Sequence, residues 1–164
     1  MKNSWKIYAE RGSMMVEALA MLGLITMVTP VLYKKAAERT TELQDINTAS
    51  QMRTISKALD DYISDNYTDL SAGDLGAVAI DKNDIVPYLP YGFDINNSKM
   101  FDEFQFAIRN ELIDAGTPKE HSAITGTILA KSDSGVPMMR AAKIASMIGA
   151  NGGVVNNNRV QGVQ

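Results

Sequence analysis

RGSMMVEALAMLGLITMVTPVLY, residues Arg11 to Tyr33, is the stretch that decides the fold. Its last twenty residues, Met14 to Tyr33, contain a single charged side chain, that of Glu17. Twenty residues of helix span roughly 30 Å, at about 1.5 Å per residue, which matches the hydrocarbon core of a bilayer. The sequence therefore predicts an apolar N-terminal helix that is long enough to cross a membrane.

Helical periodicity continues beyond the apolar run. Apolar or small residues recur at spacings of mostly three or four, and no Gly or Pro occurs between Val31 and Asp65. We expect one helix from about Ser13 to Ser64, which is apolar nearly all round in its first half and on one side in its second. Pro30 should remove one hydrogen bond and bend this helix, and Gly23 is a second weak point. The expected stripe comprises Leu32, Ala36, Thr40, Leu43, Ile46, Ser50, Met52, Ile55, Leu59 and Tyr62.

The one-sided half of this helix, residues 34–64, can pack on a domain or form a coiled-coil stalk. Its apolar positions do not keep the strict seven-residue repeat that a coiled coil requires. The 100 residues that follow also need a surface to pack on. We therefore favour a head domain, residues 65–164, that packs against this half. The charged side chains of the helix, Asp45 among them, are expected on its other faces.

The composition is that of one ordinary domain and excludes several classes of protein. The chain has 164 residues, of which 45% are hydrophobic and 21% charged. Its net charge of -3 lacks the basic excess of a nucleic-acid-binding protein. It has no cysteine and one histidine, so disulfides and zinc sites of the usual ligand types are excluded. No Walker, GxGxxG or GxSxG motif is present, so we expect no enzyme, cofactor or metal site.

Residues 65–98 predict turns, one short helix and a loop. Residues 65–76 have the composition of a turn, and residues 82–88 predict a short helix that ends at the neighbouring prolines. Tyr88, Tyr91 and Phe93 lie close together in the sequence after it. They could form a stacking platform for a sugar, although lining of the core is the commoner role of such a loop.

Two strands are predicted in the head domain. Phe104–Arg109 alternates in part, and Ala123–Lys131 is rich in β-branched residues. The linker between them contains Gly116 and Pro118, so we expect an antiparallel pair. Gly126, inside the second strand, indicates either a bulge or close packing on the long helix.

The C-terminal residues predict one more helix and a third strand. Met138–Ile148 follows Pro137 and has strong helix formers, and GANGG ends it. Val154 and Val155 predict a strand with a weak continuation to Val160. The last residues, RVQGVQ, carry no terminating signal, and we expect further chain there.

The remaining polar groups are expected to be solvated. Asp65, Asn66 and Asp69 could hold calcium, but they lack the spacing of an EF-hand loop. Adjacent carboxylates on a helix or strand do not face each other, so they make poor acid–base pairs. These groups are the pairs Asp60–Asp61 and Asp102–Glu103, and His121 beside Glu120.

The first twelve residues, MKNSWKIYAERG, form a short polar leader that contains Lys2, Lys6 and Arg11. A secretory signal peptide would be cleaved after its apolar run, but here Lys34 and Lys35 follow without an A-x-A-like site. We therefore expect the apolar segment to be retained. Basic residues flank it on both sides, so charge alone does not set its orientation.

Glu17 needs an explanation, because a charge in a membrane segment costs roughly 2.5–3.5 kcal/mol on insertion scales. One interpretation keeps this carboxylate wet, close to the lipid headgroups. The other has the chain cut after Gly12, so that Ser13 carries a new α-amino group one helical turn from Glu17. The amine and the carboxylate could then pair, within one subunit or between neighbouring subunits.

This arrangement resembles the processing site of type IV prepilins. That site has a short basic leader ending in Gly, and then a Glu as the fifth residue of a mature chain that begins with an apolar helix. Gly12, Ser13 and Glu17 match it position by position. The resemblance implies that a prepilin peptidase cuts after Gly12, that Ser13 becomes the N-methylated terminus, and that Glu17 guides docking into a filament. Ser13 departs from the common Phe or Met, which bears on methylation more than on cleavage.

Four further segments extend the resemblance: SKALDDYISDNYTDL, FQFAIRN, AITGTILAKSDSGVP and AAKIASMIGANGGVV. They look like the constant N-terminal region of shufflon-type (PilV-like) minor pilins of conjugative thin pili. The implied fold is α+β and type IV pilin-like, with a long N-terminal helix packed against a small antiparallel sheet and a short additional helix. The implied parts are a leader (1–12), a long helix (13–64, with residues 13–33 in the membrane or filament core) and a head (65–164).

The same resemblance implies a location and partners. The subunit would span the bacterial inner membrane once and then enter an extracellular pilus, with lipid, a prepilin peptidase and other pilin subunits as its successive partners. A C-terminal tip could act as an adhesin in contact between cells. Two alternatives remain: a type II secretion pseudopilin, which shares the same start, and a single-pass membrane protein with an uncleaved anchor.

Overall fold

The computed structural model describes the backbone of all residues except 1–3, 74, 157–158 and 163–164. The side chains of residues 1–16, 18, 74 and 156–164 also lie outside the described part. The chain divides into two units, Met1–Gln44 and Asp45–Gln164. Helix α1 (Ser4–Asp65) contributes to both units, and each unit is described by itself.

Helix α1 ends at Asp65, beside the predicted Ser64, but it begins at Ser4 instead of Ser13. The earlier start has a local cause, since residues 4–11 include Lys, Ala, Glu and Arg and contain no helix breaker. A single glycine such as Gly12 costs only about 1 kcal/mol in a helix. The predicted N-terminal boundary of the helix was therefore wrong by nine residues.

Pro30 and Gly23 do not break α1. Proline lacks an N–H group, so the carbonyl of Thr26, four residues earlier, loses its helical partner. Thr26 and Thr29 turn their hydroxyls back onto helix carbonyls in the preceding turn, at 2.9 Å for Thr26 Oγ1 to the Gly23 oxygen. Pro30 therefore lies inside a helix that continues to Asp65, and the bend predicted at this residue stays a prediction.

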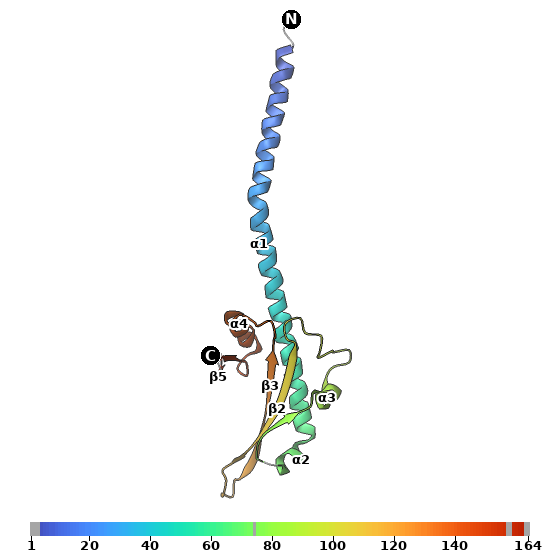
Figure 1. The fold of residues 1–164 in the computed structure, drawn as a ribbon, viewed down its shortest axis with the longest axis vertical. Helices are drawn as coiled ribbons and strands as arrows, with labels where there is room; N and C mark the ends of the chain where they lie inside the picture. The colour runs from blue at the N-terminus through green and yellow to red at the C-terminus, as the bar shows by residue number, and fades with distance from the viewer. Residues whose placement is uncertain (1–3, 74, 157–158, 163–164) are drawn as a thin grey trace. The chain divides into compact units, whose positions relative to one another are not determined.

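The second unit contains a three-stranded antiparallel sheet in the order β1-β2-β3 (Figure 1). Its strands are β1 (Gly76–Ile80), β2 (Glu103–Ile113) and β3 (His121–Lys131). The predicted antiparallel pairing of the last two is confirmed, with Phe106 opposite Ile128. Both strands are longer than predicted, because pairing continues to Ile113 and His121 and leaves only a short turn between them.

The first strand, β1, was missed in the sequence. Its five residues, GAVAI, follow a stretch of turn-like composition and include two alanines, which have little strand preference. Pairing with the central strand defines it, since Ile80 lies opposite Phe106 and Val78 opposite Ile108. A tertiary contact, and not local preference, therefore makes this segment a strand.

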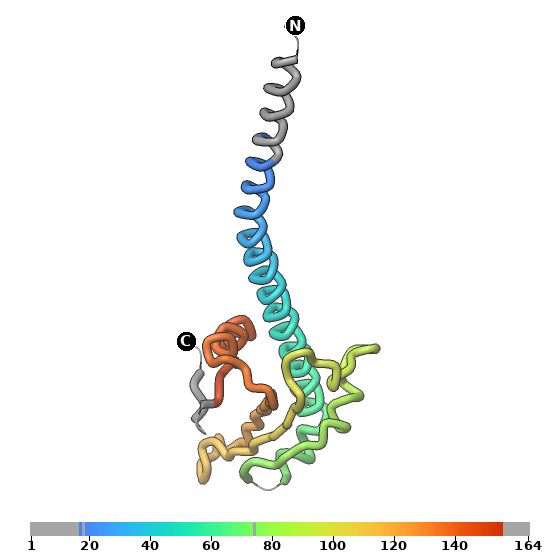
Figure 2. Tube along the Cα trace, turned by 45° about the horizontal axis from the view of Figure 1, so that its top comes forward, coloured from blue at the N-terminus to red at the C-terminus, as the bar shows by residue number. Residues whose placement is uncertain are grey.

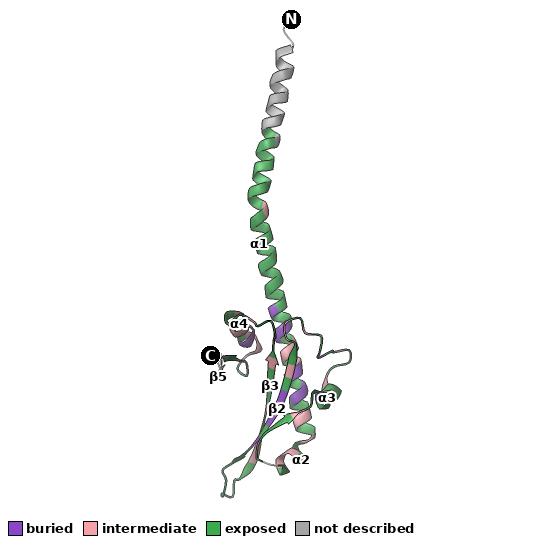
Figure 3. Ribbon diagram, viewed as in Figure 1, coloured by how far each residue is buried: buried purple, intermediate pink, exposed green. Residues whose placement is uncertain are grey.

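The core of the second unit lies between the C-terminal part of α1 and one face of the sheet (Figure 3). Ile55, Ala58 and Leu59 of α1 are buried in one cluster with Phe106 and Ile108 of β2. This confirms that the helix packs on the head, and it confirms the α+β class, an arrangement consistent with a pilin-like fold. The cluster is completed by Ile85 and Ile95, with Tyr62, Ile63, Leu70, Ile80, Tyr88, Leu89, Phe93, Phe104, Ile124 and Ile128 packed against it.

The predicted apolar stripe of α1 is correct only in its last part. Residues 30–44 are exposed, and Ile46 and Ser50 are exposed as well. The buried face instead includes Asp45, whose residue exposure is 1%, so its placement on an outer face was wrong. Asp45 and Ala49 lie one turn apart on the buried face, and the ion pairs of Asp45 with Arg140 and Lys143 stabilise it there.

Gly126 packs closely on α1, and no bulge occurs at this position. The β2–β3 register is continuous through the pair Ile108–Gly126. A Cβ atom at Gly126 would lie 2.7 Å from Leu59 Cδ2 and 2.9 Å from Ile63 Cδ1. Of the two interpretations of this glycine, close packing on the long helix is the correct one.

The region expected to be a turn, residues 65–76, contains a short helix, α2 (Tyr67–Ala72). Tertiary contacts select this helix over the turn. Tyr67 donates a hydrogen bond from its hydroxyl to the Ser122 carbonyl (2.8 Å), and Leu70 packs against the core. Asn110 donates from Nδ2 to the Leu70 carbonyl (3.1 Å), so these two hydrogen bonds hold α2 to β2 and β3, and Leu70 holds it to the core.

The short helix predicted at residues 82–88 is confirmed as α3 (Lys82–Ile85) followed by the 3-10 turn η1 (Val86–Tyr88). Asp81 caps α3, because its carboxylate accepts a hydrogen bond from the Asn83 N–H at 2.8 Å. Tyr88 and Phe93 line the core as expected. Tyr91 does not, since it is fully exposed beside Gly92, whose φ of +79° suits a tight turn.

Tyr88 also makes an edge-to-face contact with Tyr62 of α1, at 5.6 Å between ring centroids. Burial raises the pKa of the Tyr62 phenol, and the negative charge of Asp84 adds to this effect. The phenol therefore stays protonated, and able to donate a hydrogen bond, to higher pH than an exposed tyrosine.

The predicted C-terminal helix is confirmed residue for residue as α4 (Met138–Ile148). Val154 and Val155 form a strand, β4 (Gly153–Asn156), but it is not the third strand of the main sheet, which is β1. It pairs antiparallel with β5 (Arg159–Gly162) in a separate two-stranded sheet, so the predicted continuation to Val160 was wrong. Figure 2 shows α4 on one side of the C-terminal part of α1 and the loop after η1 on the other.

Substitution of Gly126 by valine should destabilise the second unit. The added atoms would overlap Leu59 and Ile63, and overpacking of this kind costs typically about 1–3 kcal/mol. We expect a lower midpoint of urea unfolding for the full chain in detergent micelles, followed by circular dichroism. Thr127→Val, at the exposed neighbouring position, is the control and should leave the midpoint nearly unchanged. Equal midpoints for both variants would contradict close packing at Gly126.

Candidate functional site in the apolar half of α1

The first unit presents uncovered apolar surface on every side of α1. Each described residue from Glu17 to Gln44 is exposed except Thr29, which is half-buried. The large apolar side chains of this region are Leu19, Met21, Leu22, Leu24, Ile25, Met27, Val28, Val31, Leu32 and Tyr33, between 50% and 77% exposed. A soluble monomer rarely exposes a continuous surface of this kind.

The free energy available from covering this surface is large. A fully buried aliphatic or aromatic side chain contributes about 1.5–3 kcal/mol, so these side chains together offer on the order of 20 kcal/mol. In the part of the chain that the structure describes, one helix is long and apolar enough to cross a membrane. This helix is α1, over its described part Leu19–Asp65. Its most apolar window has a mean hydropathy of 1.3, and none of that window is buried.

Thr26 and Thr29 add little polarity to this surface. The Thr26 hydroxyl donates to the carbonyls of Leu22 (3.1 Å) and Gly23 (2.9 Å), and that of Thr29 donates to the Ile25 carbonyl. Hydroxyls bonded in this way can enter lipid or a helix bundle without an unsatisfied donor.

Glu17 differs from these threonines. Its side chain is exposed and has no hydrogen-bond or ion-pair partner among the described residues. Tyr33, followed by Lys34 and Lys35, suits a membrane–water interface. Sixteen residues of helix separate Glu17 from Tyr33, about 24 Å at 1.5 Å per residue, so in a layer about 30 Å thick the carboxylate lies roughly one helical turn inside the opposite boundary. In a bilayer that position is within reach of the headgroups, whereas a helix bundle that excludes water must supply Glu17 with a partner.

The predicted cleavage residues Gly12 and Ser13 fall within the bounds of α1, but they lie outside the described side chains. On a helix, residues four positions apart have neighbouring side chains, about 5–6 Å apart between Cβ atoms. Glu17 is the member of the predicted site that the structure places, and it places that residue on exposed helix surface at the start of the apolar run.

The other polar candidates occupy the surface of the second unit. Asp60, Asp61 and His121 are exposed, as expected, although His121 Nδ1 lies 2.9 Å from the Lys119 carbonyl oxygen. The described residues contain no group of three or more His, Cys, Asp or Glu side chains that could hold a metal ion. At the calcium candidate, the Asn66 amide instead donates to the Tyr62 carbonyl at 2.9 Å.

The pair Asp102–Glu103 is exposed but is not simply solvated. Asp102 Oδ2 accepts a hydrogen bond from the Asp133 N–H at 2.7 Å, which fixes the chain at the end of β3. Glu103 forms an exposed ion pair with Lys131, at 3.8 Å between Oε2 and Nζ. These contacts join the start of β2 to the end of β3.

Comparison of the chain with protein-family models, with curated proteins and with solved structures gave no match. The class of protein is therefore defined by the fold itself. It is an α+β head, with a long N-terminal helix whose first half is compatible with a single membrane span.

Introducing two lysines into the apolar run, Leu24→Lys with Val28→Lys, should abolish membrane integration. Each charge near the middle of a span costs about 2.5–3.5 kcal/mol on insertion scales. We expect the double variant to leave the membrane pellet under alkaline carbonate extraction, whereas the unchanged chain stays in it. Thr40→Lys with Thr41→Lys, on exposed helix beyond the run, is the control and should remain membrane-integrated. Retention of the Leu24/Val28 variant would show that this surface does not enter lipid.

Proposed function

We propose that the chain is a minor pilin subunit of a type IV pilus of the conjugative thin-pilus kind. The observation that carries this proposal is the combination of an apolar helix exposed on all sides with one carboxylate at its start, Glu17, that has no partner among the described residues. Lipid can cover the apolar side chains of a single subunit, and the apolar halves of neighbouring subunits can cover them in a filament. Only the second kind of cover offers a specific partner for Glu17.

The proposed partner is the α-amino group of Ser13, freed when a prepilin peptidase cuts after Gly12. An unpaired charge in a water-excluded bundle is strongly destabilising, so the carboxylate favours the position at which the amine of the same or a neighbouring subunit meets it. Burial of the apolar halves then drives assembly, and Glu17 sets the register between subunits. The prepilin motif in the sequence, with its spacing of four residues from Ser13 to Glu17, supports this assignment.

The head has a different part in this proposal. It is anchored to the C-terminal part of α1 by a core of its own, so it can fold before and after the apolar half changes its surroundings. As a structural subunit of a filament, the chain needs no catalytic group. Its proposed partners are other pilin subunits, the peptidase and inner-membrane lipid. The subunit would reside first in the inner membrane and then in the extracellular pilus.

Two alternatives share the exposed apolar helix. A type II secretion pseudopilin would be processed and assembled in the same way, and the neighbouring genes would distinguish it, since they would encode secretion components and not conjugation components. A single-pass membrane protein with an uncleaved anchor would keep its leader. In that protein Glu17 would lie near the headgroups, and its replacement would leave assembly unaffected because no filament forms.

The substitution Glu17→Ala should spare cleavage and impair assembly. Removing one partner of a buried ion pair costs about 3–5 kcal/mol, so we expect at least a roughly hundredfold loss of the subunit from purified filaments. The measurement is the amount of processed subunit in sheared filaments relative to the membrane fraction, by immunoblot. Glu38→Ala, which removes an exposed carboxylate of the same helix beyond the apolar run, is the control. Normal incorporation of the Glu17→Ala subunit would count against the register role.

A further inference from the structure

The C-terminal segment 138–156, which contains α4 and β4, is built apart from the main core. Its buried residues Ile144 and Ala145 do not belong to the core cluster of α1, α3 and β2. Its strand pairs with β5 in a separate sheet. The two elements are locked to each other, because Gly152 lies so close to the Ala145 carbonyl that a Cβ atom there would be 2.1 Å from that oxygen. We call this segment the C-terminal module.

Polar contacts fasten the module to α1 near the start of α4. Asp45 Oδ1 lies 2.7 Å from Arg140 Nε, and Asp45 Oδ2 lies 3.5 Å from Lys143 Nζ. The Asp45 side chain is only 2% exposed, whereas Arg140 and Lys143 are 30% and 47% exposed. The acid is thus buried beneath the two cations of the helix that covers it.

A second contact fastens the end of α4. Arg53 Nε donates to the Ile148 carbonyl at 3.3 Å, and its Nη2 donates to the Met147 carbonyl. The last carbonyls of a helix have no partner inside it and carry partial negative charge, so a guanidinium is well suited to them. Asp45 and Arg53 are eight residues apart on α1, about 12 Å at 1.5 Å per residue, and they hold the two ends of α4.

The connection to β3 supplies a fixed point and a short joint. Asp102 accepts from the Asp133 N–H at 2.7 Å and donates its own N–H to the Lys131 carbonyl at 2.9 Å, so the chain is pinned as it leaves the strand. Gly135 follows with a φ of +73° and is exposed. Only four residues, 134–137, separate the pinned point from α4, so the module can turn about this joint without disturbing the sheet.

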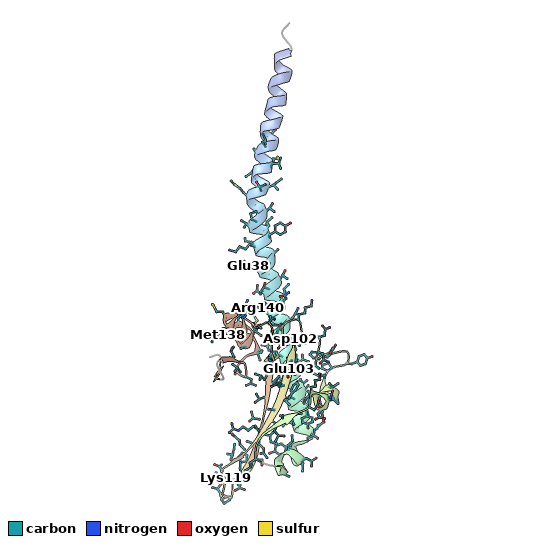
Figure 4. The ribbon with its side chains drawn as sticks, in the orientation of Figure 1. Glu38, Asp102, Glu103, Lys119, Met138 and Arg140 are labelled. Atoms are coloured by element: carbon teal, nitrogen blue, oxygen red, sulfur yellow. The ribbon has the colours of Figure 1, made fainter. Side chains whose placement is uncertain are left out.

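We propose that the C-terminal module docks on α1 and releases from it as one unit, and we call it a latch. The contacts of Asp45 and of Arg53 with α4 hold it closed, and we call them its two clasps. The main core remains folded when the latch opens, because no member of that core comes from the module. Opening returns Asp45 to water and separates α4 from the contacts that Asp45 and Arg53 make with it. Figure 4 shows the side chains of this region, with Met138 and Arg140 labelled on α4.

Hydrogen exchange of the full chain in detergent micelles, followed by mass spectrometry, tests the latch. Asp45→Asn and Arg53→Gln each remove one clasp, so each should speed exchange of the amides of residues 141–148 at least about tenfold. The amides of residues 104–112 and 122–130, in β2 and β3, should exchange at the unchanged rate. Glu103→Gln, which breaks the exposed pair with Lys131 in the same unit, is the matched control and should leave α4 unaffected.

The unsubstituted chain gives a second test that does not depend on a variant folding. Arg140 and Lys143 are partly exposed, so salt screens their attraction to Asp45 in part. Raising sodium chloride from 0.05 to 1 M should speed exchange in α4 several-fold and leave β2 and β3 unchanged. Equal acceleration of α4 and β2 in the variants, or an α4 that responds neither to the substitutions nor to salt, would overturn the latch.

Discussion

The apolar surface of α1 between Leu19 and Tyr33 is the constraint on which the rest of the structure depends. Surface of this size and continuity must be covered, and the described residues of the chain provide no cover for it. Because the hydrophobic effect is non-directional, lipid and the apolar surface of another protein chain would both satisfy this requirement. In the proposed filament Glu17 distinguishes the two, since the α-amino group of a processed subunit can pair with its carboxylate and lipid tails cannot.

The second unit, by contrast, buries its apolar side chains in a core of its own. The cluster around Ile55, Leu59 and Phe106 uses only the last part of the helix, and Gly126 brings β3 close to it. The boundary between the two units falls at Asp45, where buried side chains begin along α1. There the buried carboxylate of Asp45 pairs with Arg140 and Lys143 of α4, close to the buried apolar side chain of Ala49, whereas Ile144 and Ala145 of α4 are buried apart from the main core.

Features set by local pattern could be predicted from the sequence, and those set by distant partners could not. The long helix, α4 and the β2–β3 pair follow from periodicity, proline and glycine positions and β-branched residues. By contrast, β1 is a strand only because Phe106 and Ile108 lie opposite it, and α2 is a helix only because β2 and β3 hold it. Asp45 was misplaced because a charge was assumed to be solvated, although it lies one turn from the buried Ala49 and so on the buried face. For the candidate site, the sequence identified Glu17, and the structure adds its exposure and its lack of a described partner.

The intact mass of the native polypeptide, isolated from cells with an active prepilin-type processing protease, tests the central claim most directly. If the apolar helix is an assembly element and the Glu17 carboxylate pairs with a new terminal amine, the mature chain must begin at Ser13 and lack the twelve-residue leader. A chain that still carries Met1 in such cells would contradict the account, because no α-amino group would then lie one helical turn from Glu17.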